Sequence, residues 1–118
     1  MAEQFIPIYD PQLSTSRSSS VAYEASRVIK ATPGVLFGLS GYSSNVAAQF
    51  IQIHDASSLP ANGVAPLAFI TVPASSNFSI DFGVFGIPCF VGIVVCNSTT
   101  GPTKTIGAAD CYFTVRMR

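Results

Sequence analysis

The sequence has little charge. Only 10% of its 118 residues are Asp, Glu, Lys or Arg, six of them acidic and six basic, whereas soluble domains average about 25%. A protein that binds nucleic acid normally carries a basic excess. The equal numbers, with no basic run, therefore predict no nucleic-acid partner. A weakly charged surface favours a protein that covers much of its outside with other proteins.

The residues that usually carry chemistry are also scarce. Zinc sites need about four Cys or His ligands in close pairs, and the chain has one histidine and no CxxC or HxxxH pair. His54 stands beside Asp55, but neighbours on a strand point to opposite faces, so the two cannot belong to one Ser-His-Asp triad. The scattered carboxylates leave a glycosidase pair open, although nothing selects one. We expect no catalytic residue, metal, cofactor or small-molecule substrate, and a histidine at the surface or a sheet edge.

Three cysteines are an odd number, which does not predict a disulfide framework. On a single strand Cys89 and Cys96 would lie about 23 Å apart, beyond the roughly 7 Å that a disulfide allows. We predict buried free thiols, with the pairing of Cys111 left open. The longest apolar run, residues 86–96, is too short for the roughly 20-residue span of a membrane helix. The first residues lack the pattern of a signal peptide, and we expect no membrane partner.

Residues 86–96 are the most apolar segment of the chain. Both alternating sets of side chains are apolar, which predicts a strand covered on both faces. The β-branched residues, two glycines and Pro88 argue against a helix. We therefore interpret the segment as the central strand of the fold.

From residue 26 onward, further apolar segments alternate with Gly, Pro, Asn and Ser turns. The additional strands are predicted at residues 26–31, 34–42, 46–55, 66–72, 78–82, 103–106 and 109–116. The clearest inward faces are Phe78, Ile80 and Phe82 in one strand, and Cys111, Phe113 and Val115 in another. About eight short strands predict an all-β protein, an antiparallel β-sandwich or jelly-roll-like domain over residues 26–118. Residues 20–30 are the one place where a helical turn is allowed.

Residues 1–25 predict an extended N-terminal arm. An apolar hook of Phe5, Ile6, Ile8 and Tyr9 precedes a serine-rich stretch, residues 14–20, that is typical of a flexible tether. Exposed apolar side chains tend to become buried against a partner, so we predict that the hook contacts another protein. The alternative is a disordered tail with a few chance hydrophobic residues.

Several segments resemble a group of small virion proteins of tailed bacteriophages. The resemblance covers residues 26–112 and consists of strands and turns without chemistry. Its segments are residues 26–39 (SRVIKATPGVLFGL), 50–56 (FIQIHDA), 59–63 (LPANG), 72–74 (VPA), 78–83 (FSIDFG), 92–95 (GIVV) and 98–100 (STT).

The resemblance implies a β-sandwich carried on the virion surface and made in the host cytoplasm. We expect a capsid decoration (cement) protein that binds the major capsid protein and copies of itself, as a homo-oligomer such as a trimer. The hook of Phe5, Ile6, Ile8 and Tyr9 would then be the capsid contact. The alternative is a tail or fibre accessory module that binds another tail protein or a host glycan. For a glycan, the expected contacts are Tyr42, Asn62 and Asn97.

Overall fold

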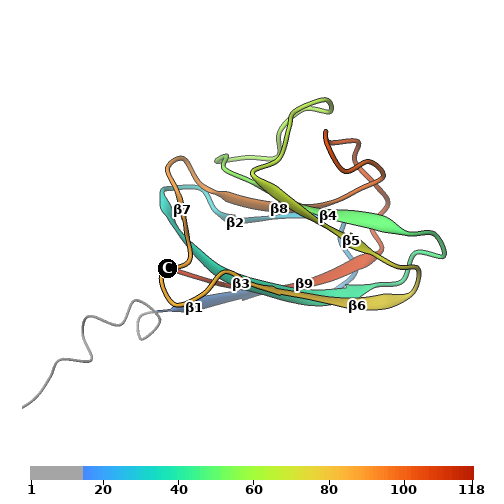
Figure 1. The fold of residues 1–118 in the computed structure, drawn as a ribbon, viewed down its shortest axis with the longest axis horizontal. Helices are drawn as coiled ribbons and strands as arrows, with labels where there is room; N and C mark the ends of the chain where they lie inside the picture. The colour runs from blue at the N-terminus through green and yellow to red at the C-terminus, as the bar shows by residue number, and fades with distance from the viewer. Residues whose placement is uncertain (1–14) are drawn as a thin grey trace, which may run out of the picture.

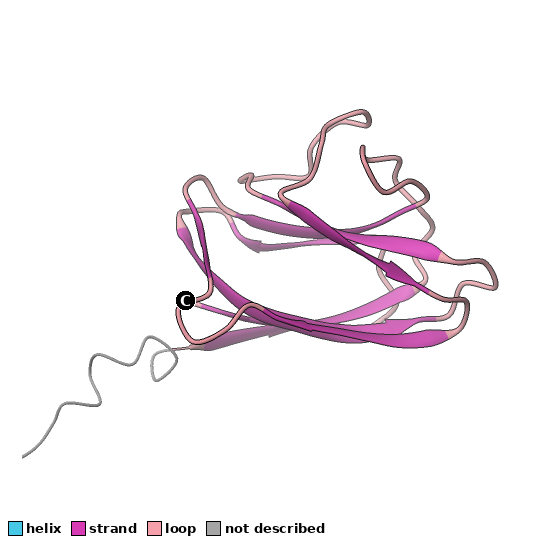
Figure 2. Ribbon diagram, viewed as in Figure 1, coloured by secondary structure: helices cyan, strands magenta, loops and turns pink. Residues whose placement is uncertain are grey.

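The computed structural model describes residues 15–118, which form two antiparallel sheets packed face to face, with no helix in this range (Figures 1 and 2). In strand order, sheet A contains β1 (Ser16–Ser19), β9 (Cys111–Met117), β3 (Gly34–Ser43) and β6 (Ser76–Asp81), and β7 (Ile87–Cys89) also pairs with β3. Sheet B contains β2 (Ser26–Lys30), β8 (Ile93–Ser98), β4 (Gln49–His54) and β5 (Ala68–Val72). The predicted antiparallel β-sandwich is confirmed.

The core lies between the sheets and follows the alternation of the strands. Cys111, Phe113 and Val115 of β9 are fully buried, as predicted. Phe78 packs on Phe113 with ring centroids 6.1 Å apart, and Ile80 and Phe82 also pack against the core. These contacts confirm both predicted inward faces. Sheet B contributes mainly Ile51, Ile53, Ile93 and Val95.

The three cysteines are free and buried, as predicted. Burial raises the pKa of the Cys89 and Cys96 thiols to about 11, and it also raises the pKa of Cys111. A thiol with a raised pKa holds little thiolate at neutral pH and reacts slowly. The cysteines therefore act as small apolar core residues.

The prediction of one central strand over residues 86–96 is wrong. The chain forms β7 in sheet A, turns at residues 90–92, and continues as β8 in sheet B. Phe90 and Val91, expected inside, are exposed at this turn. Gly92 allows the crossing, because a Cβ there would lie 2.4 Å from the Ala56 carbonyl oxygen and 2.6 Å from that of Lys30. Apolar alternation predicts burial but cannot locate a turn between two sheets.

β8 itself is buried on both faces, as the sequence predicted for this part of the run. Ile93 and Val95 belong to the core between the sheets. The opposite face of sheet B lies beneath the loops that follow β4 and β8, which rise above these strands in Figure 1. Sheet A has no comparable loops over its outer face in the described part of the chain.

The serine-rich segment is not a tether at residues 16–19, because these residues form β1 and pair with β9. The Ser20 hydroxyl accepts a hydrogen bond from Phe113 N at 2.9 Å, and the Ser18 hydroxyl accepts one from Arg27 Nε at 2.8 Å. Serine does not prevent strand formation when an unpaired sheet edge offers backbone partners. Paired backbone therefore begins before the predicted boundary at residue 26. The allowed helical turn in residues 20–30 is absent, and residues 103–106 give only an isolated bridge between Ile106 and Ser98.

Gly41 marks the tightest packing in sheet A. It pairs with Phe78 on one side and Phe113 on the other. A Cβ at this position would lie 1.9 Å from the Tyr112 carbonyl oxygen and 2.6 Å from Phe78 Cζ. Neither the backbone of a central strand nor a packed ring can move away at low cost.

We expect Gly41→Ala to lower the free energy of unfolding by about 2 kcal/mol or more, because the added methyl overpacks the core. The exposed neighbour Ser40 provides the control, and Ser40→Ala should change stability by less than about 0.5 kcal/mol. Urea denaturation of both variants tests this. Equal stabilities would show that the strand accommodates the methyl group.

Candidate functional site

Four exposed apolar side chains lie in the two loops beside β7, and we call them the apolar end: Val84, Phe85, Phe90 and Val91. Phe85 and Phe90 are the most exposed aromatic residues in the described chain, at 79% and 77%. Single exposed apolar residues are ordinary, but two largely exposed rings in the loops before and after one short strand are candidates for contact with a partner.

The chain termini of the described region lie at the same end of the sandwich (Figure 1). Val35 pairs with Pro88 of β7, and its backbone exchanges two 2.9 Å hydrogen bonds with Arg118. Ser16, the first residue of β1, pairs with Met117. The described chain therefore begins and ends at the same end of the sandwich as β7.

Asp55 fixes the loop that carries Phe90 and Val91. Its carboxylate accepts backbone hydrogen bonds from Phe90 N at 3.0 Å, Val91 N at 2.8 Å and Gly92 N at 3.2 Å. The Phe90 and Val91 donors lower the pKa of Asp55 below its ordinary value, Gly92 adds to this, and desolvation opposes it. The loop is thus tied to the end of β4.

Glycines fix the other loop, which carries Val84 and Phe85. Gly83 has φ +86° and donates its N–H to Asp81 Oδ1 at 2.8 Å. Gly86 has φ +68°, and a Cβ there would lie 2.6 Å from the Leu36 carbonyl oxygen and 2.9 Å from a ring carbon of Phe37. Both positions need the left-handed backbone that glycine adopts without strain. The two loops therefore hold their apolar side chains in defined positions.

A buried polar cluster lies on the loop-covered face of sheet B. Gln52 is fully buried, and its Nε2 donates to the carbonyl oxygens of Thr100, Gly101 and Thr103 at 2.9 to 3.1 Å. Gln52 Oε1 lies 3.0 Å from His54 Nε2. The two hydrogens of this nitrogen are shared among three loop carbonyls, which holds the loop after β8 on the sheet.

The expectation of a surface histidine is wrong, because His54 is only 2% exposed. Lys104 is equally buried, and its Nζ donates to Asn62 Oδ1 at 2.7 Å. Desolvation lowers the pKa of His54, and the charge of Lys104 lowers it further. The burial of His54 could not be predicted from the sequence, because the loops that cover it contain no apolar run. Its contacts join two loops to sheet B and assign these residues a structural role.

The residues predicted as contacts belong to two alternatives, the hook and the glycan residues. Phe5, Ile6, Ile8 and Tyr9 lie outside the described residues. Tyr42 lies on the outer face of sheet A opposite Tyr112.

The other two predicted glycan residues belong to sheet B and its loops. Asn62 accepts hydrogen bonds from Lys104 Nζ and Ile106 N. Asn97 is fully buried in β8, and its Nδ2 donates to the Ala108 carbonyl. A glycan in solution cannot contact Asn97, because the strand extends past the predicted loop boundary and turns this side chain inward.

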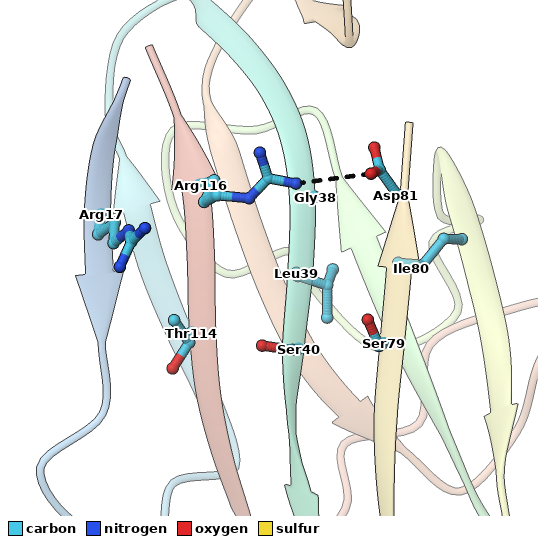
Figure 3. A pocket seen from close by; sticks show the side chains of 9 residues that line it. All are labelled: Arg17, Gly38, Leu39, Ser40, Ser79, Ile80, Asp81, Thr114 and Arg116. Atoms are coloured by element: carbon cyan, nitrogen blue, oxygen red, sulfur yellow. Dashed lines mark ion pairs between the residues drawn. The ribbon is translucent and has the colours of Figure 1, made fainter. Parts of the chain in front are cut away.

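The outer face of sheet A carries a shallow groove of about 300 Å³ that the sequence did not reveal (Figure 3). Gly38 forms its floor between Arg116 and Asp81, whose Nη2 and Oδ2 atoms lie 3.8 Å apart. The remaining lining residues are Arg17, Leu39, Ser40, Ser79, Ile80 and Thr114. These residues come from four strands that are distant in the sequence, so only sheet pairing brings them together.

No group of three or more His, Cys, Asp or Glu side chains suitable for a metal ion occurs within residues 15–118. The same part of the chain contains no helix that is long and apolar enough to cross a membrane. No protein-family model, curated protein or solved structure matches this chain. The resemblance to phage virion proteins therefore stays a prediction, and the function has to be argued from the geometry.

We expect Asp55→Asn to lower the free energy of unfolding by about 1–2 kcal/mol, because a neutral amide cannot replace three charge-assisted bonds at a half-buried site. Hydrogen exchange at the amides of residues 90–92 should accelerate. Asp81→Asn is the control, since Asp81 accepts one such backbone bond. The role assigned to Asp55 fails if its substitution costs no more than that of Asp81.

We expect stability to fall as the pH is lowered below 6.5, because the folded state holds His54 with a lowered pKa. Below pH 6.5 the unfolded chain binds a proton at His54 that the folded chain does not bind. The free energy of unfolding therefore keeps its full value above pH 6.5 and decreases as the pH falls from 6.5 toward the pKa of His54 in the folded state. The lowered pKa of Asp55 changes the stability only when the pH falls below its ordinary pKa of about 3.8.

Urea denaturation at pH 7.5 and 5.5 isolates this effect, because the chain has no other histidine. The variant His54→Gln should show a smaller difference between the two pH values. An identical difference in wild type and variant would assign the pH dependence to other groups.

Proposed function

We propose that the protein is a virion structural protein that decorates a bacteriophage capsid through protein–protein contacts and has no enzymatic role. The observation that carries this proposal is the apolar end, where two defined loops present Phe85 and Phe90 to solvent. The weakly charged composition and the resemblance of residues 26–112 to virion proteins support the same function.

The apolar end supplies the binding energy in this proposal. Buried aromatic side chains cover about 150–250 Å² each, and apolar burial contributes about 25 cal/mol per Å². Two phenylalanines with their neighbouring valines then contribute several kcal/mol of gross stabilisation, from which the cost of association is subtracted. Neighbouring capsid subunits offer repeated sites, so an oligomer of the protein would bind with avidity.

The hook of Phe5, Ile6, Ile8 and Tyr9 can reach the same partner in this proposal. The described chain begins at the same end of the sandwich as β7, and the fourteen residues that precede it in the sequence can span at most about 50 Å. One capsid subunit or its neighbour is therefore within range of both surfaces. A tail or fibre location is the alternative, and the copy number per particle distinguishes it from a shell protein.

The double variant Phe85→Ser/Phe90→Ser should bind capsids at least tenfold more weakly, a loss of about 1.4 kcal/mol. Co-sedimentation with purified capsids of the encoding phage, prepared without this protein, measures the affinity. Val46→Ser is the matched control, because Val46 is 91% exposed in the loop between β3 and β4. Deletion of residues 1–14 tests the hook while it leaves β1 intact.

Wild-type affinity in the double variant would exclude the apolar end as the contact. Undiminished binding after the deletion would exclude the hook. If the wild-type protein itself fails to bind capsids, the proposal of capsid decoration is wrong.

A further inference from the structure

A second groove, which we call the sheet B groove, lies between the end of β4 and the loop that follows it. Its volume is about 350 Å³, within the range of small-ligand sites, which begins near 300 Å³. Its walls are mainly apolar, and Val64 and Leu67 within them are 42% and 47% exposed. Pro60 and Pro66 also line it, and His54 is its one buried polar residue. The groove therefore has an apolar wall and a polar group beneath it.

Backbone hydrogen bonds hold the loop that forms this wall. Leu67 N donates to the Ile53 carbonyl oxygen at 2.8 Å. Gly63 N donates to the Lys104 carbonyl oxygen, and Lys104 N donates to that of Val64, both at 2.8 Å. The loop is thus fixed to β4 and to the loop after β8. A preformed groove binds a side chain without the cost of ordering its own walls.

His54 provides the groove with an unused hydrogen-bond acceptor. Gln52 Nε2 donates to three loop carbonyls, so its Oε1 is the acceptor that faces His54 Nε2 at 3.0 Å. The proton of the neutral ring is therefore on Nε2, and Nδ1 keeps its lone pair. Desolvation lowers the pKa of His54, which favours this neutral ring. Within residues 15–118, Nδ1 has no hydrogen-bond partner, although His54 is only 2% exposed.

An apolar wall with one acceptor suits an aromatic ring that carries a single hydroxyl donor, which is the chemistry of a tyrosine. The chain has four tyrosines. Tyr23 packs on Tyr112 with ring centroids 4.3 Å apart, and Tyr42 is paired with Tyr112 in sheet A. Tyr9 is the fourth, and it belongs to the hook, outside the described residues. It is the tyrosine whose contacts are not already defined.

The position of β1 favours the groove of a second copy over that of the same copy. Tyr9 precedes Ser16 by seven residues, which span at most about 25 Å. Ser18 in β1 is bonded to Arg27 in β2, whereas the groove lies two strands away at β4, on the far side of sheet B (Figure 1). Two strand spacings of about 4.8 Å and a sheet separation of about 10 Å lie between them. A path around the sandwich would use nearly all of this length, and the hook of a neighbouring copy has no such constraint.

We propose that the sheet B groove binds Tyr9 of a second copy of this chain. The ring packs against the prolines and Leu67, and the hydroxyl donates a hydrogen bond to His54 Nδ1. Each copy has one hook and one groove, so exchange between copies gives a closed oligomer. This contact does not depend on capsid binding and does not use the apolar end. It leaves the other three apolar side chains of the hook to the capsid contact proposed above.

Sedimentation velocity of the full chain at increasing concentration tests the exchange. We expect an oligomer that Tyr9→Ser weakens by about tenfold or more. Tyr9→Phe should weaken it by only about two- to tenfold, because it keeps the ring and loses one hydrogen bond. Leu67→Asp should resemble Tyr9→Ser. The control is Val28→Asp, since Val28 is also 47% exposed on sheet B, and its association should stay within about twofold.

A wild-type chain that remains a monomer at millimolar concentration overturns the proposal. Equal losses in Leu67→Asp and Val28→Asp would also overturn it, because the groove would then have no special role. Capsid co-sedimentation is a separate measurement, so a failure of this proposal is distinguishable from a failure of the proposed function.

Fluorescence identifies the copy that receives the hook. The chain has no tryptophan, so Tyr9→Trp introduces a single reporter whose N–H is also a donor. We expect the emission of a buried indole, and that of an exposed indole in the double variant Tyr9→Trp/Leu67→Asp. An excess of Tyr9→Ser protein, which has an intact groove, should restore buried emission to the double variant. Absence of restoration would overturn binding by a second copy, and circular dichroism confirms that each variant folds.

Discussion

The arrangement of the sandwich depends on the contact between the Asp55 carboxylate and the backbone N–H groups of residues 90–92. At this point the chain leaves sheet A after β7 and enters sheet B as β8. Because the contact holds the turn at the end of β4, the most apolar segment of the chain contributes to both sheets. It also exposes Phe90 and Val91, while Gly92 fits between the backbones of β2 and the loop after β4.

The outer faces of the two sheets differ in their exposure to solvent. On sheet B, Gln52 accepts and donates hydrogen bonds beneath the loops, and these bonds satisfy carbonyl groups that would otherwise be buried without partners. The loops can therefore cover β8 on its second face. Sheet A keeps an open outer face with arginine, hydroxyl and tyrosine side chains. The apolar end and the outer face of sheet A are therefore two surfaces that a partner can reach.

Sequence patterns predicted most strands well and the sites poorly. The inward faces of β6 and β9 followed from alternation, because Phe78 and Phe113 stand in regular period-two segments. The prediction of one strand over residues 86–96 was wrong, because a turn between two sheets can be as apolar as a strand. The serines of β1 were predicted as a tether, but they form a strand, because backbone pairing with β9 stabilises it. No sequence pattern indicated the groove over Gly38, because its lining residues lie on strands that are far apart in the chain.

The sequence by itself determined an all-β sandwich with buried free thiols, because alternation and turn residues act over a few neighbouring positions. It also determined the low charge that favours partner contacts. Only the tertiary structure decided that His54 and Lys104 are buried, that Asn97 faces inward, and that Arg17 stands beside Arg116. These outcomes depend on strand register and on loops folding back over a sheet. Both are set by packing between segments that the linear order does not bring together.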